Sequence, residues 1–151
     1  MTSLSRQKIL EKLQHLQEYI EYLHTLQKEC SAEQSFVSDF HLFGNTERYL
    51  QLSIQAIIDA SHLLILNLGF KRPTDNYEAV STLFEKNILA DDLAHAITRM
   101  IGLRNLLVHE YGQIDRKKIF HFLQHNLKDI EAFRDQISSV IAQDSRDNAA
   151  T

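Results

Sequence analysis

Apolar side chains recur at alternating intervals of four and three residues near the start of this chain. The repeat is formed by Ile9, Leu13, Leu16, Ile20 and Leu23. This spacing places all five on one face of a helix, so residues 5–29 are predicted to be a long helix. A seam of this kind favours a fold in which helices pack against one another.

The composition points the same way. The 151 residues include only one proline and four glycines, and 44% are hydrophobic, which leaves few places for tight β-turns. An all-α fold is therefore predicted. The length suits a single domain spanning residues 1–151, with the small, polar segment 144–151 expected to fray.

The spacing of apolar residues predicts four more helices. They are expected over residues 46–68, 75–86, 91–112 and 115–143, with a short helical turn after Ser31 and an apolar knot over residues 36–43. Asn45 or Thr46 would cap the first of these helices and Asp115 the last, while Gly112 would end the third. The predicted architecture is an up-and-down bundle of about five helices.

Cysteine use and hydropathy favour the cytoplasm. Cys30 is the single cysteine, so the chain forms no internal disulfide, which suits a reducing compartment. Residues 1–6 lack the apolar core of a signal peptide. The most apolar window, residues 54–68, is interrupted by polar side chains and is predicted to be a buried helix rather than a membrane span.

The charge balance limits the possible partners. The net charge is −4 and the pI about 6.0, so any contact with nucleic acid must be local. Two small basic groups could serve, Lys71-Arg72 and Arg116-Lys117-Lys118. Each is equally consistent with ordinary solvated charges.

Several kinds of chemistry find no support. The sequence contains no glycine-rich phosphate loop, no GxGxxG, no GxSxG and no HExxH. His121 and His125 are four residues apart and could face a metal together, but a pair without a third ligand is more typical of solvated histidines. We expect neither a metal nor a cofactor.

The most informative stretch is residues 104–111, where polar side chains crowd the end of a predicted helix. At about 100° per residue, Arg104 points the same way as the apolar Ile97, Met100 and Ile101. A guanidinium in an apolar stripe requires a partner. The stretch is therefore either a structural hydrogen-bond network or a site that acts on an anion.

Arg104 and His109 together would suffice for RNA cleavage without a metal. A histidine can take a proton from a ribose 2′-hydroxyl or give one to a leaving 5′-oxygen, and an arginine can stabilise the charge on the phosphate. On a straight helix the two positions are about 140° apart. Either the last turn unwinds near His109, or two protomers share one cleft.

A second face of the same helix suggests the second protomer. It is formed by His95, Thr98, Gly102, Asn105, Leu106 and His109. A mid-helix glycine costs up to about 1 kcal/mol relative to alanine, and Leu106 beside it would be exposed in a monomer. We expect another copy of the chain to approach closely here, forming a homodimer.

Residues Arg104 to Tyr111 match the Arg-x4-His-x-Tyr signature of the HEPN superfamily, and the chain resembles the HepT-like ribonuclease toxins of prokaryotic toxin–antitoxin pairs. The stretch 47–60 resembles the second helix of that family. The resemblance implies a metal-independent endoribonuclease with Arg104 and His109 as catalytic pair, leaving a 2′,3′-cyclic phosphate. Asn105 would support the cleft.

The resemblance also implies a partner. Tyr111 would line the site and be modified with AMP by a cognate nucleotidyltransferase antitoxin, which would add negative charge beside Arg104. Arg48 matches an arginine of the family and joins the basic group 116–118 as a candidate RNA contact: Arg48, Arg116, Lys117 and Lys118.

Two alternatives remain open on the sequence. The chain could be an HEPN protein without cleavage activity that binds nucleotides or an antitoxin. It could also be a structural bundle in which the Arg104 network merely satisfies a helix end. The first would bind without cutting RNA, and the second would lose stability by about 1–3 kcal/mol when the network is broken.

Overall fold

A computed structural model of the chain describes residues 1–109 and 115–150, apart from the side chains of Val108 and His109. Over these ranges every regular element is a helix, which confirms the all-α prediction. Seven helices are present where about five were expected: α1 (Ser3–Glu29), α2 (Glu33–Ser38), α3 (Phe40–Asn67), α4 (Asn76–Glu85), α5 (Asp91–His109), α6 (Arg116–His125) and α7 (Leu127–Ala149).

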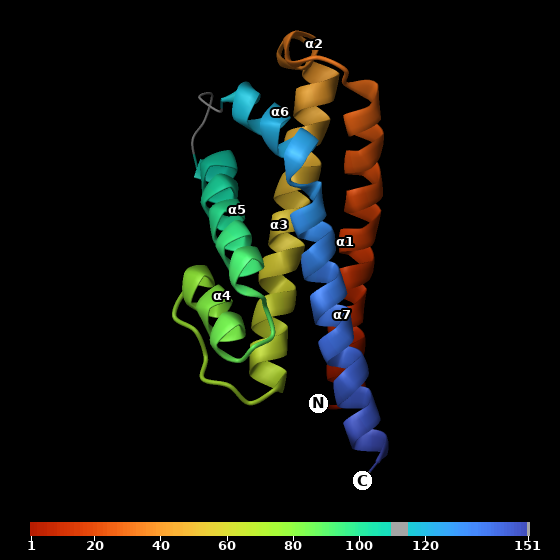
Figure 1. The fold of residues 1–151 in the computed structure, drawn as a ribbon, viewed down its shortest axis with the longest axis vertical. Helices are drawn as coiled ribbons and strands as arrows, with labels where there is room; N and C mark the ends of the chain where they lie inside the picture. The colour runs from red at the N-terminus through yellow and green to blue at the C-terminus, as the bar shows by residue number, and fades with distance from the viewer. Residues whose placement is uncertain (110–114, 151) are drawn as a thin grey trace.

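Helix α3 lies at the centre of the fold. It packs along α1 on one side and against α4, α5 and α6 on others, while α7 runs beside α1 (Figure 1). The short α2 joins α1 to α3 at one end of the molecule, and both termini lie at the other end (Figure 1). The fully buried side chains that fill the interior include Ile20, Leu23, Ile54, Ile57 and Phe133.

The start of α3 differs from the prediction. The helix begins at Phe40, capped by the Asp39 carboxylate, which accepts a hydrogen bond from the His41 amide at 2.9 Å. Asn45 and Thr46, predicted as caps, instead lie inside the helix and donate to carbonyls four residues earlier, at 2.8 and 2.7 Å. This internal bonding lets both polar side chains sit within a helix, so the predicted boundary is wrong.

The long helix expected over residues 115–143 is also different. Asp115 caps its start as predicted, accepting from the Lys117 amide at 3.0 Å. The helix breaks at Asn126, where φ is −116° and ψ is 3°, so α6 and α7 follow different directions. Helix α7 then continues to Ala149, within the segment 144–151 that was expected to fray, and Asp144 pairs with the Arg6 guanidinium at 3.3 Å.

Among the described residues, one helix is long and apolar enough to cross a membrane by length and composition, and it is α3. Of its most apolar window, 56% is buried inside the structure. Because α3 packs between α1 and the α4–α5 pair, it has the role of a core helix, as the interrupted apolar window predicts.

Candidate active site around Arg104

Arg104 lies on α5 in line with the buried side chains of Ile97, Met100 and Ile101, as predicted. Its guanidinium is half-buried and donates from Nη2 to Oε1 of Gln55 on α3 at 2.8 Å. A longer contact of 3.5 Å joins Nη1 to Oδ1 of the neighbouring Asn105. Among the described residues, the partners of this arginine are thus uncharged amides, and no carboxylate pairs with its guanidinium.

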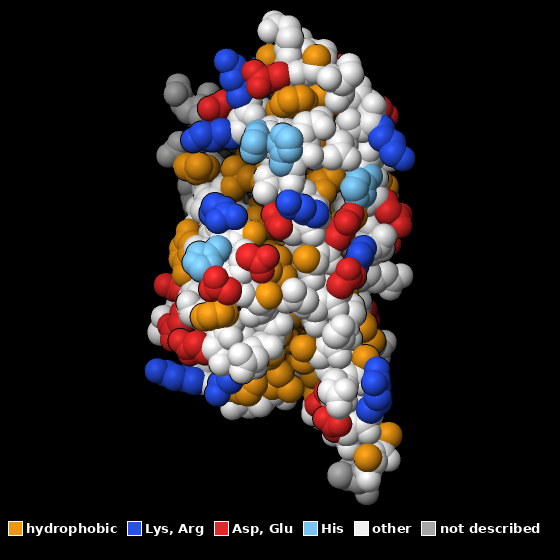
Figure 2. Space-filling model, viewed as in Figure 1, with side chains coloured by type: hydrophobic (Ala, Val, Ile, Leu, Met, Phe, Trp, Pro, Cys, Tyr) orange, Lys and Arg blue, Asp and Glu red, His pale blue; other side chains and the backbone are white. Residues whose placement is uncertain are grey.

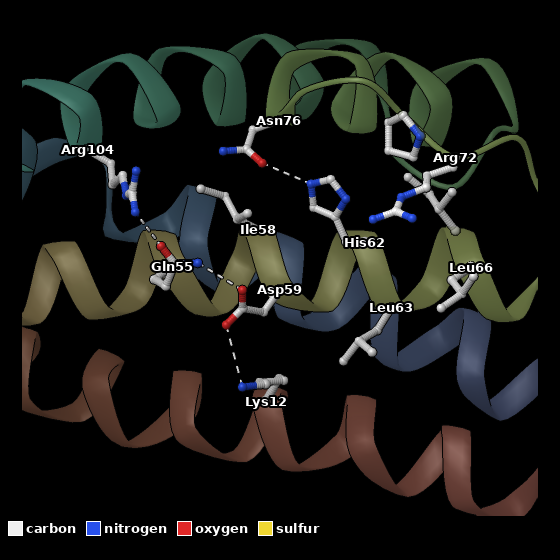
Figure 3. Close-up of a pocket in the computed structure, with 12 residues that line it drawn as sticks. Lys12, Gln55, Ile58, Asp59, His62, Leu63, Leu66, Arg72, Asn76 and Arg104 are labelled. Atoms are coloured by element: carbon white, nitrogen blue, oxygen red, sulfur yellow. Dashed lines mark hydrogen bonds and ion pairs between the residues drawn. The ribbon is translucent and has the colours of Figure 1, made fainter.

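Gln55 is itself held in place. Its amide nitrogen donates to Oδ1 of Asp59 at 2.8 Å, and the other oxygen of Asp59 lies 3.5 Å from Nζ of Lys12 on α1. The chain of contacts therefore runs from α5 through α3 to α1 (Figure 3). Because both ends of the Gln55 amide are engaged, its oxygen is fixed toward Arg104.

One further donor of Arg104 stands out. Its Nε is buried and has no hydrogen-bond partner among the described residues. Buried N–H groups without a partner are few in folded proteins, and Arg6 Nε near the termini is in the same state. The guanidinium of Arg104 is thus held in one orientation while at least one of its N–H donors lacks an acceptor among the described residues.

Arg104 forms one end of a pocket of about 750 Å³ along α3 (Figure 3). The pocket reaches from α5 to the loop that joins α3 to α4, and Lys12 of α1 borders it. His62 on its wall bonds through Nε2 to Oδ1 of Asn76 at 2.9 Å. The lining is completed by Gln55, Ile58, Asp59, Leu63, Ile65, Leu66, Arg72 and Pro73.

Asn105 contacts α4 rather than the pocket. Its amide nitrogen lies 3.4 Å from the hydroxyl oxygen of Tyr77. The same hydroxyl would be 3.9 Å from a Cβ added at Gly102, an ordinary contact, so the neighbour that faces Gly102 within the chain is Tyr77. Leu106 and Tyr77 are 43% and 42% exposed, so the predicted exposure of Leu106 in a single chain is confirmed.

The other half of the predicted catalytic pair is only partly described. The backbone of α5 is helical through His109, so the helix does not end before that position. The side chain of His109, and all of Tyr111 and Gly112, lie outside the described residues. Their placement beside Arg104 stays a prediction.

The candidate RNA contacts are spread over the surface. Arg116 packs its guanidinium 3.6 Å from the centre of the Phe43 ring and donates to the Val37 carbonyl at 3.0 Å. Burial raises the pKa of the nearby Glu47, and the charge of Arg116 partly opposes that rise. Arg116 is therefore tied into the fold near α2 and α3.

The remaining basic candidates are exposed and lie away from the pocket at Arg104. Arg48 and Lys117 project from α3 and α6, and Lys118 borders a separate pocket of about 330 Å³ beside α5. On the face shown in Figure 2, basic and acidic side chains are interspersed. The described residues of that face thus form no extended basic patch.

His121 and His125 do lie side by side, with ring centroids 4.5 Å apart. Among the described residues, no group of three or more histidine, cysteine, aspartate or glutamate side chains is placed to hold a metal ion. The pair thus has no third ligand within the described part of the chain.

The sequence analysis missed the residues that surround Arg104. Gln55, Asp59 and His62 are among the polar side chains that interrupt the apolar window of residues 54–68. They stand at i, i+4 and i+7, the spacing of one helix face, so this polar stripe within an apolar helix was the available signal. Lys12 and Asn76 carried no comparable signal, because only the packing of α1 and α4 on α3 brings them to the pocket.

The helices and the Arg104 site define an all-helical protein with a pocket suited to an anion. The solved structure of a tri-AMPylated HEPN toxin from Shewanella oneidensis, in complex with an MNT antitoxin, superposes with a TM-score of 0.80 at 25% identity, covering 92% of this chain and 99% of that one. The Ribonuclease HepT-like family model matches residues 9–137. The chain belongs to the HepT-like family.

Two curated relatives are named nucleases. A tRNA nuclease HepT from Aphanizomenon flos-aquae is 32% identical over 141 residues, which covers 93% of this chain and 95% of the relative. An mRNA nuclease HepT from Shewanella oneidensis is 29% identical over 104 residues, covering 69% and 78% of the two chains.

Proposed function

We propose that this protein is a metal-independent endoribonuclease toxin of a toxin–antitoxin pair. The observation that carries the proposal is the uncharged anchoring of Arg104, whose guanidinium is held by Gln55 at 2.8 Å on the wall of a pocket. An arginine without a carboxylate partner keeps its full charge for a phosphate. Membership of the HepT-like family, with two curated relatives named as nucleases, supports RNA as substrate.

The proposed reaction uses His109 and Arg104. His109 accepts the proton of a ribose 2′-hydroxyl, and the resulting 2′-oxygen attacks the adjacent phosphorus. Arg104 stabilises the negative charge that builds on the non-bridging oxygens. The bond to the 5′-oxygen breaks, the leaving oxygen takes up a proton from water, and His109 gives its proton back to the solvent. The products carry a 2′,3′-cyclic phosphate and a 5′-hydroxyl.

A homodimer supplies the geometry for this reaction. Because α5 is continuous through His109, helix positions 104 and 109 are about 140° apart around its axis. Two protomers facing one cleft would let the arginine of one act with the histidine of the other. The exposed Leu106, on the second face of α5, and Tyr77, which contacts Asn105 on that face, are apolar surface that such a partner would cover.

The proposed partner is a nucleotidyltransferase antitoxin that AMPylates Tyr111 in the cytoplasm. The solved complex of an AMPylated HEPN toxin with an MNT antitoxin supports this assignment. Each AMP adds a phosphate charge and a bulky group near Arg104, which would repel and block RNA. Tyr111→Phe is expected to keep the ribonuclease active and to make it resistant to the antitoxin with ATP.

The test of the proposal is cleavage of total cellular RNA by the purified protein in EDTA. Wild type should cut, while Arg104→Ala and His109→Ala should not, and both variants should melt near the wild-type temperature. Lys128→Ala, an exposed position on α7, is the matched control and should cut normally. Failure of a folded protein with unmodified Tyr111 to cut RNA would favour a non-catalytic HEPN module that binds nucleotides or the antitoxin.

A further inference from the structure

The pocket at Arg104 extends farther than the proposed reaction needs. Arg104 marks one end, and the far end is formed by His62 on α3 together with Arg72 in the loop before α4 (Figure 3). Pro73, the next residue of that loop, also lines the pocket. The full volume of about 750 Å³ is within the range of small-molecule sites. The space beyond Arg104 is therefore large enough for a ligand group of its own.

The lining of this pocket carries a net positive charge, although the protein as a whole is acidic. Its lining contains three basic side chains, Lys12, Arg72 and Arg104, and a single carboxylate, Asp59. Lys12 lies 3.5 Å from Asp59 and neutralises it, so the two arginines remain as net charge. Against an overall charge of −4, this local excess favours an anion.

Arg72 is free to bind such an anion. It is exposed, and among the described residues no side chain pairs with its guanidinium. Figure 3 shows the guanidinium extending along the pocket toward the ring of His62. An arginine held along a pocket wall without a carboxylate partner can donate to phosphate with two parallel hydrogen bonds.

His62 adds a polar contact of fixed orientation. Its Nε2 donates to Oδ1 of Asn76 at 2.9 Å, so the other ring nitrogen, Nδ1, is left as an acceptor in the neutral ring. In Figure 3 that nitrogen lies on the side of Arg72. A ribose hydroxyl or an amino group of a base could donate to it.

The rest of this end of the pocket is apolar. Leu63 and Pro73 line it, Ile58 lies between it and Arg104 (Figure 3), and Leu66, which is 67% exposed, stands at its rim. A flat base can rest against such a surface while its phosphate and sugar meet the polar groups. Cations, one oriented acceptor and an apolar wall together match the three parts of a nucleotide.

We propose that the end of the pocket formed by His62 and Arg72 binds the nucleotide next to the scissile phosphate of the RNA substrate. This proposal rests on the proposed function, since it places the reacting phosphate at Arg104. Arg72 binds the neighbouring phosphate, His62 accepts a hydrogen bond from the sugar or base, and the base lies against Ile58, Leu63 and Pro73. The site then contributes affinity for RNA rather than chemistry.

The test compares two adjacent cations in the same loop. Arg72→Ala removes a side chain that lines the pocket, and Lys71→Ala removes the same charge from an exposed side chain that does not. The probe is a short fluorescein-labelled RNA of mixed sequence, and its binding to proteins that also carry His109→Ala is followed by fluorescence anisotropy in EDTA over a series of salt concentrations. Without His109 the RNA binds but is not cut by the proposed reaction.

We expect Arg72→Ala to weaken binding about tenfold at low salt and to reduce the salt slope by about 0.7, the value for one phosphate on a single strand. The affinity of Lys71→Ala should stay within about twofold of wild type. Arg72→Lys should keep part of the affinity, because lysine retains the positive charge but cannot donate the two parallel hydrogen bonds of a guanidinium. Equal losses in Arg72→Ala and Lys71→Ala would overturn the site.

Cleavage separates this proposal from the proposed function. On a cleavable RNA, Arg72→Ala should raise KM about tenfold and leave kcat within about twofold of wild type. Unchanged KM and binding, in an enzyme that still cuts, would refute the subsite alone. Binding that depends on Arg72 in a wild-type protein that never cuts would refute the ribonuclease and leave the subsite standing.

Discussion

Arg104 on α5 and Gln55 on α3 are joined by a hydrogen bond of 2.8 Å from Nη2 to Oε1. The bond fixes a cation between two helices without neutralising it, because the partner is an amide. Gln55 is fixed in turn by Asp59 at 2.8 Å. The orientation of Arg104 is thus determined by residues about fifty positions earlier in the chain.

This relationship predicts that Gln55 positions Arg104 during catalysis. Gln55→Ala should lower kcat about tenfold to a hundredfold, the cost of a misplaced catalytic group, while the free energy of unfolding falls by only about 1 kcal/mol for the lost hydrogen bond. Gln55→Glu should lower activity further, since a carboxylate there would neutralise Arg104. Steady-state kinetics on RNA and urea unfolding measure the two effects.

The control for Gln55 is Gln51→Ala, one turn earlier on α3 and outside the pocket. It should leave kcat unchanged. In an Arg104→Ala background, Gln55→Ala should have no further effect on the affinity for RNA, because the two residues act as a unit. Independent, multiplying losses would show that Gln55 acts by some other route.

Arg116 is predicted to stabilise the fold. Its guanidinium lies 3.6 Å from the Phe43 ring centre and donates to the Val37 carbonyl at 3.0 Å. Loss of both contacts in Arg116→Ala should cost about 1–2 kcal/mol of unfolding free energy. Lys117→Ala, the exposed neighbour, should cost almost nothing, and similar unfolding curves for the two variants would contradict the assignment.

Glu47 and Glu78 predict opposite effects of pH on stability. Burial raises the pKa of Glu47, so between its unfolded and folded pKa values the folded state binds the proton more tightly and stability falls as pH rises. Hydrogen bonds from Thr74 lower the pKa of Glu78. Its contribution is present above the unfolded pKa and is lost as pH falls through the folded value.

Urea unfolding of Glu47→Gln and Glu78→Gln across the acidic range measures both effects. Relative to wild type, Glu47→Gln should gain stability as pH rises from the unfolded pKa of Glu47 toward neutrality. Glu78→Gln should lose stability over the corresponding rise from the lowered pKa of Glu78. A loss of stability in Glu47→Gln over the same rise in pH, relative to wild type, would show that the folded state does not raise the pKa of Glu47.

Lys117 and Lys118 are predicted to attract RNA only from a distance, since both are exposed and lie outside the pocket at Arg104. Cleavage should fall with rising salt. Replacing both lysines with alanine should lower kcat/KM modestly at low salt and leave the two-arginine pocket to supply most of the slope. A flat salt response of the wild type would contradict phosphate contact altogether.

Periodicity and end signals predicted the helical class and most helix positions, because buried seams such as Ile9 to Leu23 repeat regularly. The predicted helix boundaries were wrong where a polar side chain could form its hydrogen bond either as a cap or inside the helix. Asn45 and Thr46 have cap chemistry, yet inside the helix they bond carbonyls four residues back. The apolar spacing continues from α6 into α7, so it gave no sign that the helix breaks at Asn126.

The sequence predicted Arg104 as a site residue but not the residues that surround it. Arg104 was identified because a guanidinium in an apolar stripe needs a partner, but nothing in the sequence indicated which one. Gln55 answers that need through the packing of α5 on α3, and Lys12 enters through α1. Arg72 was noted as a loop cation, and its position on the pocket wall depends on how the loop after α3 returns to the helix.

The most direct test of the account is the chemistry of the cut itself. A synthetic RNA that the wild type cleaves in EDTA should yield a 2′,3′-cyclic phosphate and a 5′-hydroxyl by mass spectrometry, and a single 2′-deoxy nucleotide at the cleaved position should abolish cleavage. Arg104→Ala should cut neither substrate. Cleavage of the deoxy-substituted RNA, or products with 5′-phosphate ends, would contradict attack by the 2′-hydroxyl and with it the proposed roles of Arg104 and His109.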